Sequence, residues 1–537
     1  MAMIRWSGFQ GENRAIHPKL LSDSVCTVSR NQKPGRGDLR PWKSPLLVAT
    51  VPAGRQTIYR MGRDVASDAQ YWLSWTGTVH AVRGYNAEDT TEQTFYTGDG
   101  APKVTNNIMA LSSAPFPTAS RPLGLPGPTA APTVTAVVNA SGKGSNATYV
   151  YTYTYVNDWG WESAPSPPST ALVRKTDDTA TISGFASVPS GNYQINRIRI
   201  YRSQTSTSGT ADYFFLREVS LGTLSTTDDN RTLGEVLPST TWITPPDDLK
   251  NLTPMWLGML AGISGNSVRL CEAYIPYAWP IAYDIVPADS KPVALGVFGQ
   301  NLLILTTSRP VLAAGSSPES MDSSPMEFSQ ACVSAASAVS MGSGVAWASE
   351  DGLCWYGAGG ARILTAGIML REDWQALKPA TIIGKMYEGL YFGSYDDGSG
   401  RKGFMIDTGN PSGIYFLDAG YSALHFDELR DQLYVLDGAD IKKWDAGTSM
   451  TVRAVSKVFR ATSSVNFGAA EVVADSYPVT AKFYADGALK HTQIVTSRAP
   501  FRLPSGFAAL DWQLEVTGAA AVQGVAMAST MQELGSA

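Results

Sequence analysis

The chain has 537 residues, long enough for several domains and a large core. Its 50 glycines and 32 prolines favour an all-β chain with many turns, and its low share of charged residues, 17%, indicates a surface that partners cover in part. A formal net charge of −5 argues against general nucleic-acid binding, although it leaves room for a local basic patch.

The four cysteines, Cys26, Cys271, Cys332 and Cys354, lie far apart and form no CxxC pair, so they lack the spacing of a zinc site. We expect them to be buried thiols in a chain that folds in a reducing cytosol. The sequence shows no signal peptide and no apolar run long enough to span a bilayer.

Residues 1–50 are predicted to form an extended arm without a core of its own. Three prolines and two glycines interrupt the stretch 28–45, which carries the cations Arg30, Lys33, Arg36, Arg40 and Lys43. We expect the arm to lie on its own or a neighbouring subunit, and the alternative is a basic contact to DNA or to an acidic partner. Because apolar side chains of such a segment need burial elsewhere, Trp42 is expected at a subunit boundary.

Residues 51–115 are predicted to be the first part of a β-propeller, whose remaining blades follow the insert. Within them, YWLSWTGTVHAVRG (71–84) has the pattern of a strand-turn-strand hairpin with Gly77 at its turn. The segment 116–133 is rich in proline and glycine, which is typical of a linker.

Residues 130–246 are predicted to be a small β-sandwich inserted into that domain. TYVYTYTYV (148–156) alternates strictly and places Tyr149, Tyr151, Tyr153 and Tyr155 on one face. Short alternating strands over this length fit an immunoglobulin-like domain, and residues 151–169 resemble the fibronectin type III pattern. We expect the tyrosine face to be core, and the alternative is a platform for sugars.

Residues 247–450 are predicted to be blades of a β-propeller. One strand-turn-strand unit recurs about every 43 residues. Its copies are the segments 259–273, 301–315, 345–359, 390–407 and 433–447. A blade cannot bury both of its faces alone, so neighbouring blades cover one another. The alternative is a β-sandwich with regular strand spacing, and residues 452–537, whose strands leave this period, are predicted to be a C-terminal β-sandwich.

The sequence offers no catalytic constellation. His17, His80, His425 and His491 lie in four segments without metal-ligand spacing. SEDGLCW (349–355) approaches the blade signature of sialidases but lacks one residue, so Asp351 and Gly352 are better explained as a hairpin turn. DDGSG (396–400) has carboxylates for calcium, yet a solvated turn is expected. We therefore predict a protein that is not an enzyme and that binds no cofactor or metal.

Several stretches together resemble tail proteins of bacteriophages, in particular the propeller-bearing nozzle or tail-hub proteins of short-tailed phages. The stretches are GENRAIHPKLL (11–21), RGDLRPWK (36–43), CEAYIPYAWP (271–280), ALGVFGQNLLILTTSRPVLAAGSSPESM (294–321), QACVSAASAV (330–339) and SEDGLCWYG (349–357). The resemblance covers most of residues 1–450. The inserted domain departs from the smallest members of that family, which leaves the exact position in the tail open.

The resemblance implies a structural subunit of the virion tail, made in the host bacterial cytoplasm. Such proteins form a ring, commonly of six subunits, below the portal and adaptor. The ring retains packaged double-stranded DNA, conducts it without sequence specificity and anchors a tail fibre, spike or needle. No catalytic residues carry over. The candidate interface residues are those of the arm, Arg36, Arg40, Trp42 and Lys43, with Arg36 or Arg40 expected to pair with carboxylates across the boundary. The alternative function is a carbohydrate-binding or glycan-cleaving β-propeller with accessory sandwiches.

Overall fold

The computed structural model describes residues 3–62, 67–139, 143–205 and 211–535. The protein is all-β, with 46% of it in strands and 6% helical, which confirms the predicted class. The helices are short: α1 (Asn107–Ala110), α2 (Arg371–Ala376) and α3 (Met531–Gly535). Within the described ranges, no helix is long and apolar enough to cross a membrane.

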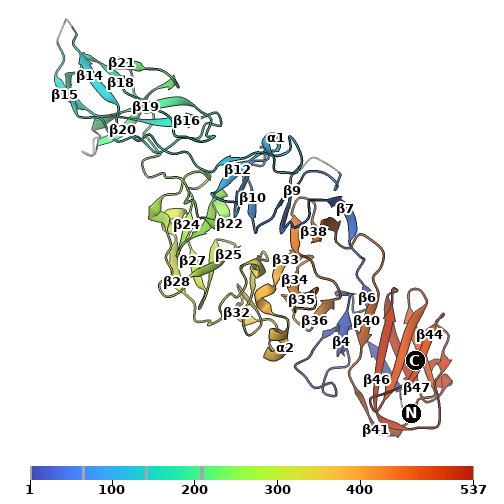
Figure 1. The fold of residues 1–537 in the computed structure, drawn as a ribbon. Coiled ribbons are helices and arrows are strands. Elements are labelled where there is room, and N and C mark those ends of the chain that lie inside the picture. The colour runs from blue at the N-terminus through green and yellow to red at the C-terminus, as the bar shows by residue number, and fades with distance from the viewer. Residues whose placement is uncertain (1–2, 63–66, 140–142, 206–210, 536–537) are drawn as a thin grey trace. The chain divides into compact units, whose positions relative to one another are not determined.

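The chain divides into two compact units, which are described separately. The first unit comprises Met1–Thr78, Asp289–Leu312 and Ser324–Ala537, and the second comprises Val79–Ala288 and Ala313–Ser323. Figure 1 labels the strands of both.

Antiparallel sheets that follow one another along the chain make up most of the first unit. One sheet contains β29 (Val339–Ser340), β30 (Gly344–Ala348), β31 (Leu353–Gly357) and β32 (Gly360–Ile363). The next begins with β33 (Ile383–Tyr387), β34 (Leu390–Asp396), β35 (Arg401–Asp407) and β36 (Ile414–Leu417). A third contains β37 (Ala423–Asp427), β38 (Gln432–Asp437), β39 (Asp440–Lys443) and β7 (Leu46–Thr50). Two further pairs are β8 (Thr57–Arg60) with β9 (Trp72–Trp75), and β25 (Pro292–Phe298) with β26 (Asn301–Thr306).

The recurring segments hold equivalent places in these sheets. Segments 345–359, 390–407 and 433–447 are the hairpins β30–β31, β34–β35 and β38–β39, each the second and third strands of its own sheet. Segment 301–315 contains β26 and β27 (Val311–Ala314), which precedes β28 (Asp322–Pro325). In the second unit, segment 259–273 contains the hairpin of β23 (Leu260–Ser264) and β24 (Ser267–Leu270).

The sheet that begins with β33 is buried on both faces, as the repeat requires. Tyr391 packs in an apolar cluster with residues of the preceding sheet, such as Trp355. Its neighbour Phe392 packs on the opposite face with Leu433 and Trp444 of the following sheet. The first strands also lie side by side in the order β8, β37, β33, β29 and β25. Successive sheets therefore bury one another.

The hairpin predicted at 71–84 is wrong. β9 pairs back with β8, whereas β10 (His80–Arg83) pairs forward with β11 (Thr94–Thr97). The Thr57 hydroxyl donates to the carbonyl of Gly77, which holds residue 77 beside β8. The glycine thus marks a connection between two sheets, and local sequence patterns do not distinguish such a connection from a hairpin turn.

The second unit contains two antiparallel sheets beside the inserted region. One is formed by β10, β11, β12 (Lys103–Thr105) and β13 (Arg121–Pro122), and the other by β22 (Lys250–Pro254), β23 and β24. β10 lies against β22.

The described residues of the insert, 130–246, form three sheets around an apolar core. One sheet contains β14 (Thr133–Val137), β18 (Thr179–Ser183) and β21 (Ser225–Asp228), and a second contains β16 (Tyr151–Asn157), β19 (Ile195–Thr205) and β20 (Ala211–Ser220). β15 (Asn146–Tyr149) pairs with β17 (Leu172–Lys175). Tyr151, Tyr153 and Tyr155 are fully buried between the sheets, whereas Tyr149 is half-buried. The tyrosine face is therefore mainly core, as predicted.

Excision of the inserted sheets should leave the remaining sheets folded if the boundaries respect β13. The predicted linker 116–133 contains β13, which pairs with β12, and Gly124 lies against Pro245. Deleting residues 126–242 with a short flexible linker keeps this strand, so we expect one cooperative thermal transition by circular dichroism. Deleting residues 112–247 removes β13 and should lower the midpoint temperature of thermal unfolding by at least a few degrees relative to the shorter deletion. Equal midpoints for the two deletions would contradict this boundary.

The C-terminal residues lie in two sheets around a core, within the first unit, and the second of these continues the sheet that begins with β33. β47 (Val522–Ala528) lies between β1 (Met3–Ser7) and β42 (Ala469–Ala474), which pairs with β45 (Phe501–Arg502). In the second sheet, β46 (Ala509–Gly518) pairs with β40 (Val452–Val455), β41 (Phe459–Val465) and β43 (Val479–Ala485), and β44 (Ala488–Val495) pairs with β43. The predicted off-period strands of residues 452–537 are therefore present, with an N-terminal strand added.

One carboxylate of this second sheet makes the stability of the protein depend on pH. Glu515 accepts hydrogen bonds from Arg453 (2.9 Å), Lys482 (3.1 Å) and Tyr484 (2.8 Å). Burial alone would raise the pKa of Glu515, but these partners outweigh it and lower the pKa to about 2. The ionised form is therefore favoured in the folded state, and its stabilisation is lost as the pH falls from about 4.5 toward 2.

We expect Glu515→Gln to make the free energy of unfolding less dependent on pH below about 4.5. At pH 7 the variant should have a free energy of unfolding lower than that of the wild type by on the order of 2 kcal/mol, and this difference should shrink toward zero near pH 2. Urea unfolding at several pH values measures it. Glu471→Gln is the matched control, because Glu471 pairs with Arg498, a mostly exposed side chain. A pH-independent effect of Glu515→Gln would contradict the assignment.

Candidate functional site

The N-terminal segment, residues 3–50, forms seven strands within the fold, whereas the sequence predicts an extended arm there. It forms β1, β2 (Gln10–Glu12), β3 (Val25–Cys26), β4 (Val28–Arg30), β5 (Gln32–Lys33), β6 (Arg40–Pro41) and β7. Trp6, Phe9 and Leu39 belong to the core of the C-terminal sheets. The prediction of an arm buried on another subunit is thus corrected for these residues, since their burial is within the chain itself.

Strand β4 joins the repeated sheets to the C-terminal sheets. Arg30 pairs in parallel register with Phe416 of β36, and Val28 pairs in antiparallel register with Val455 of β40. One hydrogen-bonded sheet therefore runs from β33 through β36, β4, β40, β46 and β43 to β44 (Figure 1). Backbone pairing across this junction opposes separation of the two regions.

A buried carboxylate fixes the segment beside β36. Glu12 Oε2 accepts hydrogen bonds from Arg30 Nη1 at 2.5 Å and from the Ser29 backbone N–H at 3.0 Å, and Glu12 Oε1 accepts one from Arg14 Nε at 2.5 Å. Both guanidinium groups lie over the Phe416 ring, at 4.7 and 4.8 Å from its centre. The two cations neutralise a charge that would otherwise be costly to bury. Sequence reasoning missed this site, because Phe416 is about 400 positions away along the chain.

Trp42 is buried inside its own chain. Its ring centre lies 5.7 Å from that of Trp444, in a cluster with Leu433 and Phe392. Lys33 Nζ lies 4.3 Å from the centre of the indole ring and pairs with Asp445 at 2.8 Å. Burial of Trp42 is as expected, but its location is not, and the side chain offers no surface to a neighbouring subunit.

The three basic candidates have different surroundings. Arg40 pairs with Asp38 of the same chain at 2.9 Å. Lys43 is exposed, and its backbone N–H donates to Asp445. Arg36 is exposed in a turn between Gly35 and Gly37. Arg36 and Lys43 therefore remain available to a partner.

In the motifs considered for enzymatic or metal chemistry, the polar side chains form hydrogen bonds and ion pairs within the chain. Ser349 is buried and its hydroxyl donates to the Gly352 carbonyl, while Asp351 pairs with Arg371 at 2.7 Å. Asp397 accepts from the Ser399 backbone N–H and from Lys402 Nζ at 2.8 Å, so a lysine occupies the carboxylate considered for calcium. No group of three or more metal-ligating side chains occurs in the part of the chain that the structure describes.

His425 is held neutral in the first unit. It lies edge-on to the rings of Tyr59 and Trp72, and its Nε2 accepts a hydrogen bond from the backbone N–H of Arg60. Burial, together with the charges of Lys385 and Arg60, lowers the pKa of His425 to about 3. The ring is therefore uncharged at neutral pH.

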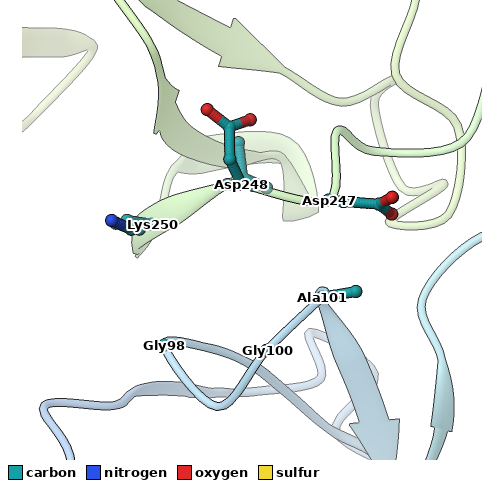
Figure 2. A pocket seen from close by; sticks show the side chains of 7 residues that line it. Gly98, Gly100, Ala101, Asp247, Asp248 and Lys250 are labelled. Carbon is teal, nitrogen blue, oxygen red and sulfur yellow. The ribbon is translucent and has the colours of Figure 1, made fainter.

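A pocket of about 310 Å³ lies in the second unit, between the turn after β11 and the start of β22 (Figure 2). It is lined by Gly98, Gly100, Ala101, Asp247, Asp248, Leu249 and Lys250. Asp248 points away from the glycine turn and accepts from Ser264 Oγ at 2.6 Å. Asp247 and Lys250 also point away from each other. The pocket thus brings together no acid, base and nucleophile that could act jointly.

No family model and no curated protein matches this chain. Among solved structures, the WD40 domain of Toxoplasma gondii coronin is similar at 12% identity and a TM-score of 0.24, over 76% of this chain and 89% of that one. PorZ, a bacterial surface component of the type-IX secretion system of Porphyromonas gingivalis, is similar at 10% identity and a TM-score of 0.23, over 86% and 77%. An exo-beta-1,3-galactanase from Phanerochaete chrysosporium has 10% identity and a TM-score of 0.17, over 65% and 93%. Similarities this weak say nothing about what the chain does.

Proposed function

We propose that the repeated sheets are blades of a β-propeller that carries an immunoglobulin-like or fibronectin-like insert. The meander order within each sheet, the contacts between first strands and the burial of both faces support this arrangement. Strand β7 supports it further, because an N-terminal strand that completes the last sheet is a way to close a ring of blades.

The protein is, in this proposal, a structural subunit of a phage tail ring below the portal and adaptor. The ring retains packaged DNA, conducts it during ejection and anchors a fibre, spike or needle. The observation that carries the proposal is the sheet that continues through β4 from the repeated sheets into the C-terminal sheets. Pulling these regions apart requires breaking the backbone pairing of β4 with β36 or with β40, and such a continuous sheet suits a part that withstands the pressure of packaged DNA.

Two features considered for carbohydrate chemistry have structural explanations. Tyr151, Tyr153 and Tyr155 fill a core, so they present no stacking surface to a sugar. The sialidase-like turn at Asp351 is also explained by its pairing with Arg371.

Mass measurement tests the proposal directly. The purified full-length chain, alone and mixed with a portal–adaptor complex, is measured by light scattering and imaged by negative-stain electron microscopy. Rings of several copies, or a stable complex with the adaptor, are expected. A chain that stays monomeric under all conditions and binds no adaptor would overturn it, and cleavage of a polysaccharide by that chain would favour the alternative.

A further inference from the structure

Two half-exposed tyrosines form a fixed pair on the second unit. Tyr85 and Tyr274 are each 50% exposed, and their ring centres lie 5.4 Å apart with the rings at 65°. The Tyr85 hydroxyl donates to the backbone carbonyl of Tyr274 at 2.6 Å. Tyr274 lies in the stretch CEAYIPYAWP, whose role the fold leaves unexplained. The pair presents two ring faces at a defined angle.

Backbone geometry holds this pair in place at a conformational cost. Leu257 and Tyr274 have φ values of 54° and 60°, which bulky residues rarely adopt. The Tyr274 backbone N–H donates to the Leu257 carbonyl at 3.0 Å, which links the two strained residues. A Cβ on Gly258 would lie 2.7 Å from the Tyr85 ring, so only glycine allows the rings to pack there. Strain that keeps exposed aromatic rings rigid is typical of binding sites.

The surroundings of the pair favour a cationic group. Aromatic faces carry negative potential, and two rings at this angle can contact one guanidinium or ammonium group. Glu272 precedes Tyr274 by two residues, and the Tyr283 hydroxyl lies 2.9 Å from Glu272 and 3.2 Å from Glu319. One phenolic proton cannot satisfy both carboxylates, so the cluster of Tyr283, Glu272 and Glu319 is electronegative.

The chain carries an exposed cation in an exposed bend. Arg36 lies between Gly35 and Gly37, whose φ values are 132° and 81° and which have open space where a Cβ would be. Asp38 is already paired with Arg40. The Arg36 turn, residues 35–37, thus offers a guanidinium to a partner.

We infer that the Arg36 turn of one copy binds the tyrosine pair of a second copy of this chain. The inference rests on the proposed function and names one contact of the ring. The two surfaces differ, so the association is head-to-tail, and such contacts close into rings when the rotation between copies allows it. Arginine suits this role because its planar group stacks on aromatic rings and stays charged.

Substitutions on either surface should weaken the oligomer equally. We expect Arg36→Ala and Tyr274→Ala each to raise the subunit dissociation constant roughly tenfold to thirtyfold, with a smaller effect for Arg36→Lys. The double variant should be little worse than either single one, because both remove the same contact. Arg40→Ala is the matched control, since Arg40 pairs within its own chain. Circular dichroism checks that each variant folds, and Arg36→Ala decides the question if Tyr274→Ala does not fold.

Crosslinking between different copies gives a second readout. Pro34→Cys and Ala273→Cys, which lie beside the contact and keep Arg36 and Tyr274, are made in separate chains, mixed and treated with a short bis-maleimide. The four native cysteines are buried, and burial raises the pKa of their thiols, so they react slowly. A linked dimer is expected in the mixture, and none when Val138→Cys, an exposed position of the insert, replaces Ala273→Cys.

The outcomes separate this inference from the proposed function. Rings of unchanged stability in both single variants, without crosslinking, would overturn the contact and leave the tail-ring proposal standing. Loss of polysaccharide binding by Tyr274→Ala, with unchanged rings, would instead assign the pair to a saccharide and overturn the inference. A wild-type chain that stays monomeric and joins no tail complex would overturn both.

Discussion

Removing residues 1–45 is expected to unfold most of the first unit. The deletion takes β1 from beside β47 and β4 from between β36 and β40, and it removes Trp6, Phe9 and Leu39 from one core and Trp42 from another. The shortened chain should be insoluble or lack a cooperative transition. The sequence alone predicts the opposite result, a folded propeller that assembles poorly.

Single substitutions measure the same effect without removing backbone. Trp6→Ala and Trp42→Ala should each lower the free energy of unfolding by about 3–5 kcal/mol, because each empties a fully buried site. Urea unfolding followed by circular dichroism measures the loss. Arg36→Ala, an exposed position of the same segment, should change it by less than about 0.5 kcal/mol. A folded, soluble deletion variant, or near-neutral tryptophan variants, would restore the idea of a detachable arm.

The repeat was predictable because its signal is local. Each strand-turn-strand segment alternates and closes on a polar turn, and the same pattern returns at a near-constant distance, so the hairpins β30–β31, β34–β35 and β38–β39 were found. The buried tyrosines of β16 followed from strict alternation in the same way. The pattern of segment 71–84 indicates a hairpin that does not form, because β9 pairs with β8, a strand that precedes the segment.

The role of the N-terminal segment was not predictable from one sequence. Its strands are two to five residues long and separated by prolines and glycines, so they have no measurable period. Their partners, such as Val455 for Val28 and Phe416 for Arg30, lie hundreds of positions away. For the same reason, the sequence predicts that Trp42 and its neighbouring cations form an interface with another subunit. In the structure, Lys33 lies over the Trp42 ring and pairs with Asp445 of the same chain. The tyrosine pair depends on contacts between loops and on positive φ values, which no spacing reveals.

Asp228→Asn is expected to destabilise the inserted sheets strongly. The Asp228 carboxylate is fully buried and accepts hydrogen bonds from Arg174 (2.8 Å), Arg202 (2.7 Å) and Tyr151 (2.8 Å). Arg174 is also fully buried, and both guanidinium groups lie near the Tyr149 ring. Removing the one carboxylate leaves buried positive charge uncompensated, which costs about 3–5 kcal/mol.

Hydrogen exchange followed by mass spectrometry locates this effect in the full-length chain. In Asp228→Asn, amides of β16, β18, β19 and β21 should exchange faster, whereas those of β33–β36 keep their wild-type rates, because the network lies within the insert. Asp229→Asn is the matched control, because the Asp229 carboxylate is next in sequence and pairs with Arg217 and Arg231 at the surface. This substitution should leave the exchange rates almost unchanged. Equal effects of the two variants would show that the buried pairing does not stabilise the insert. Faster exchange that extended into β33–β36 would show that the insert and the repeated sheets unfold together.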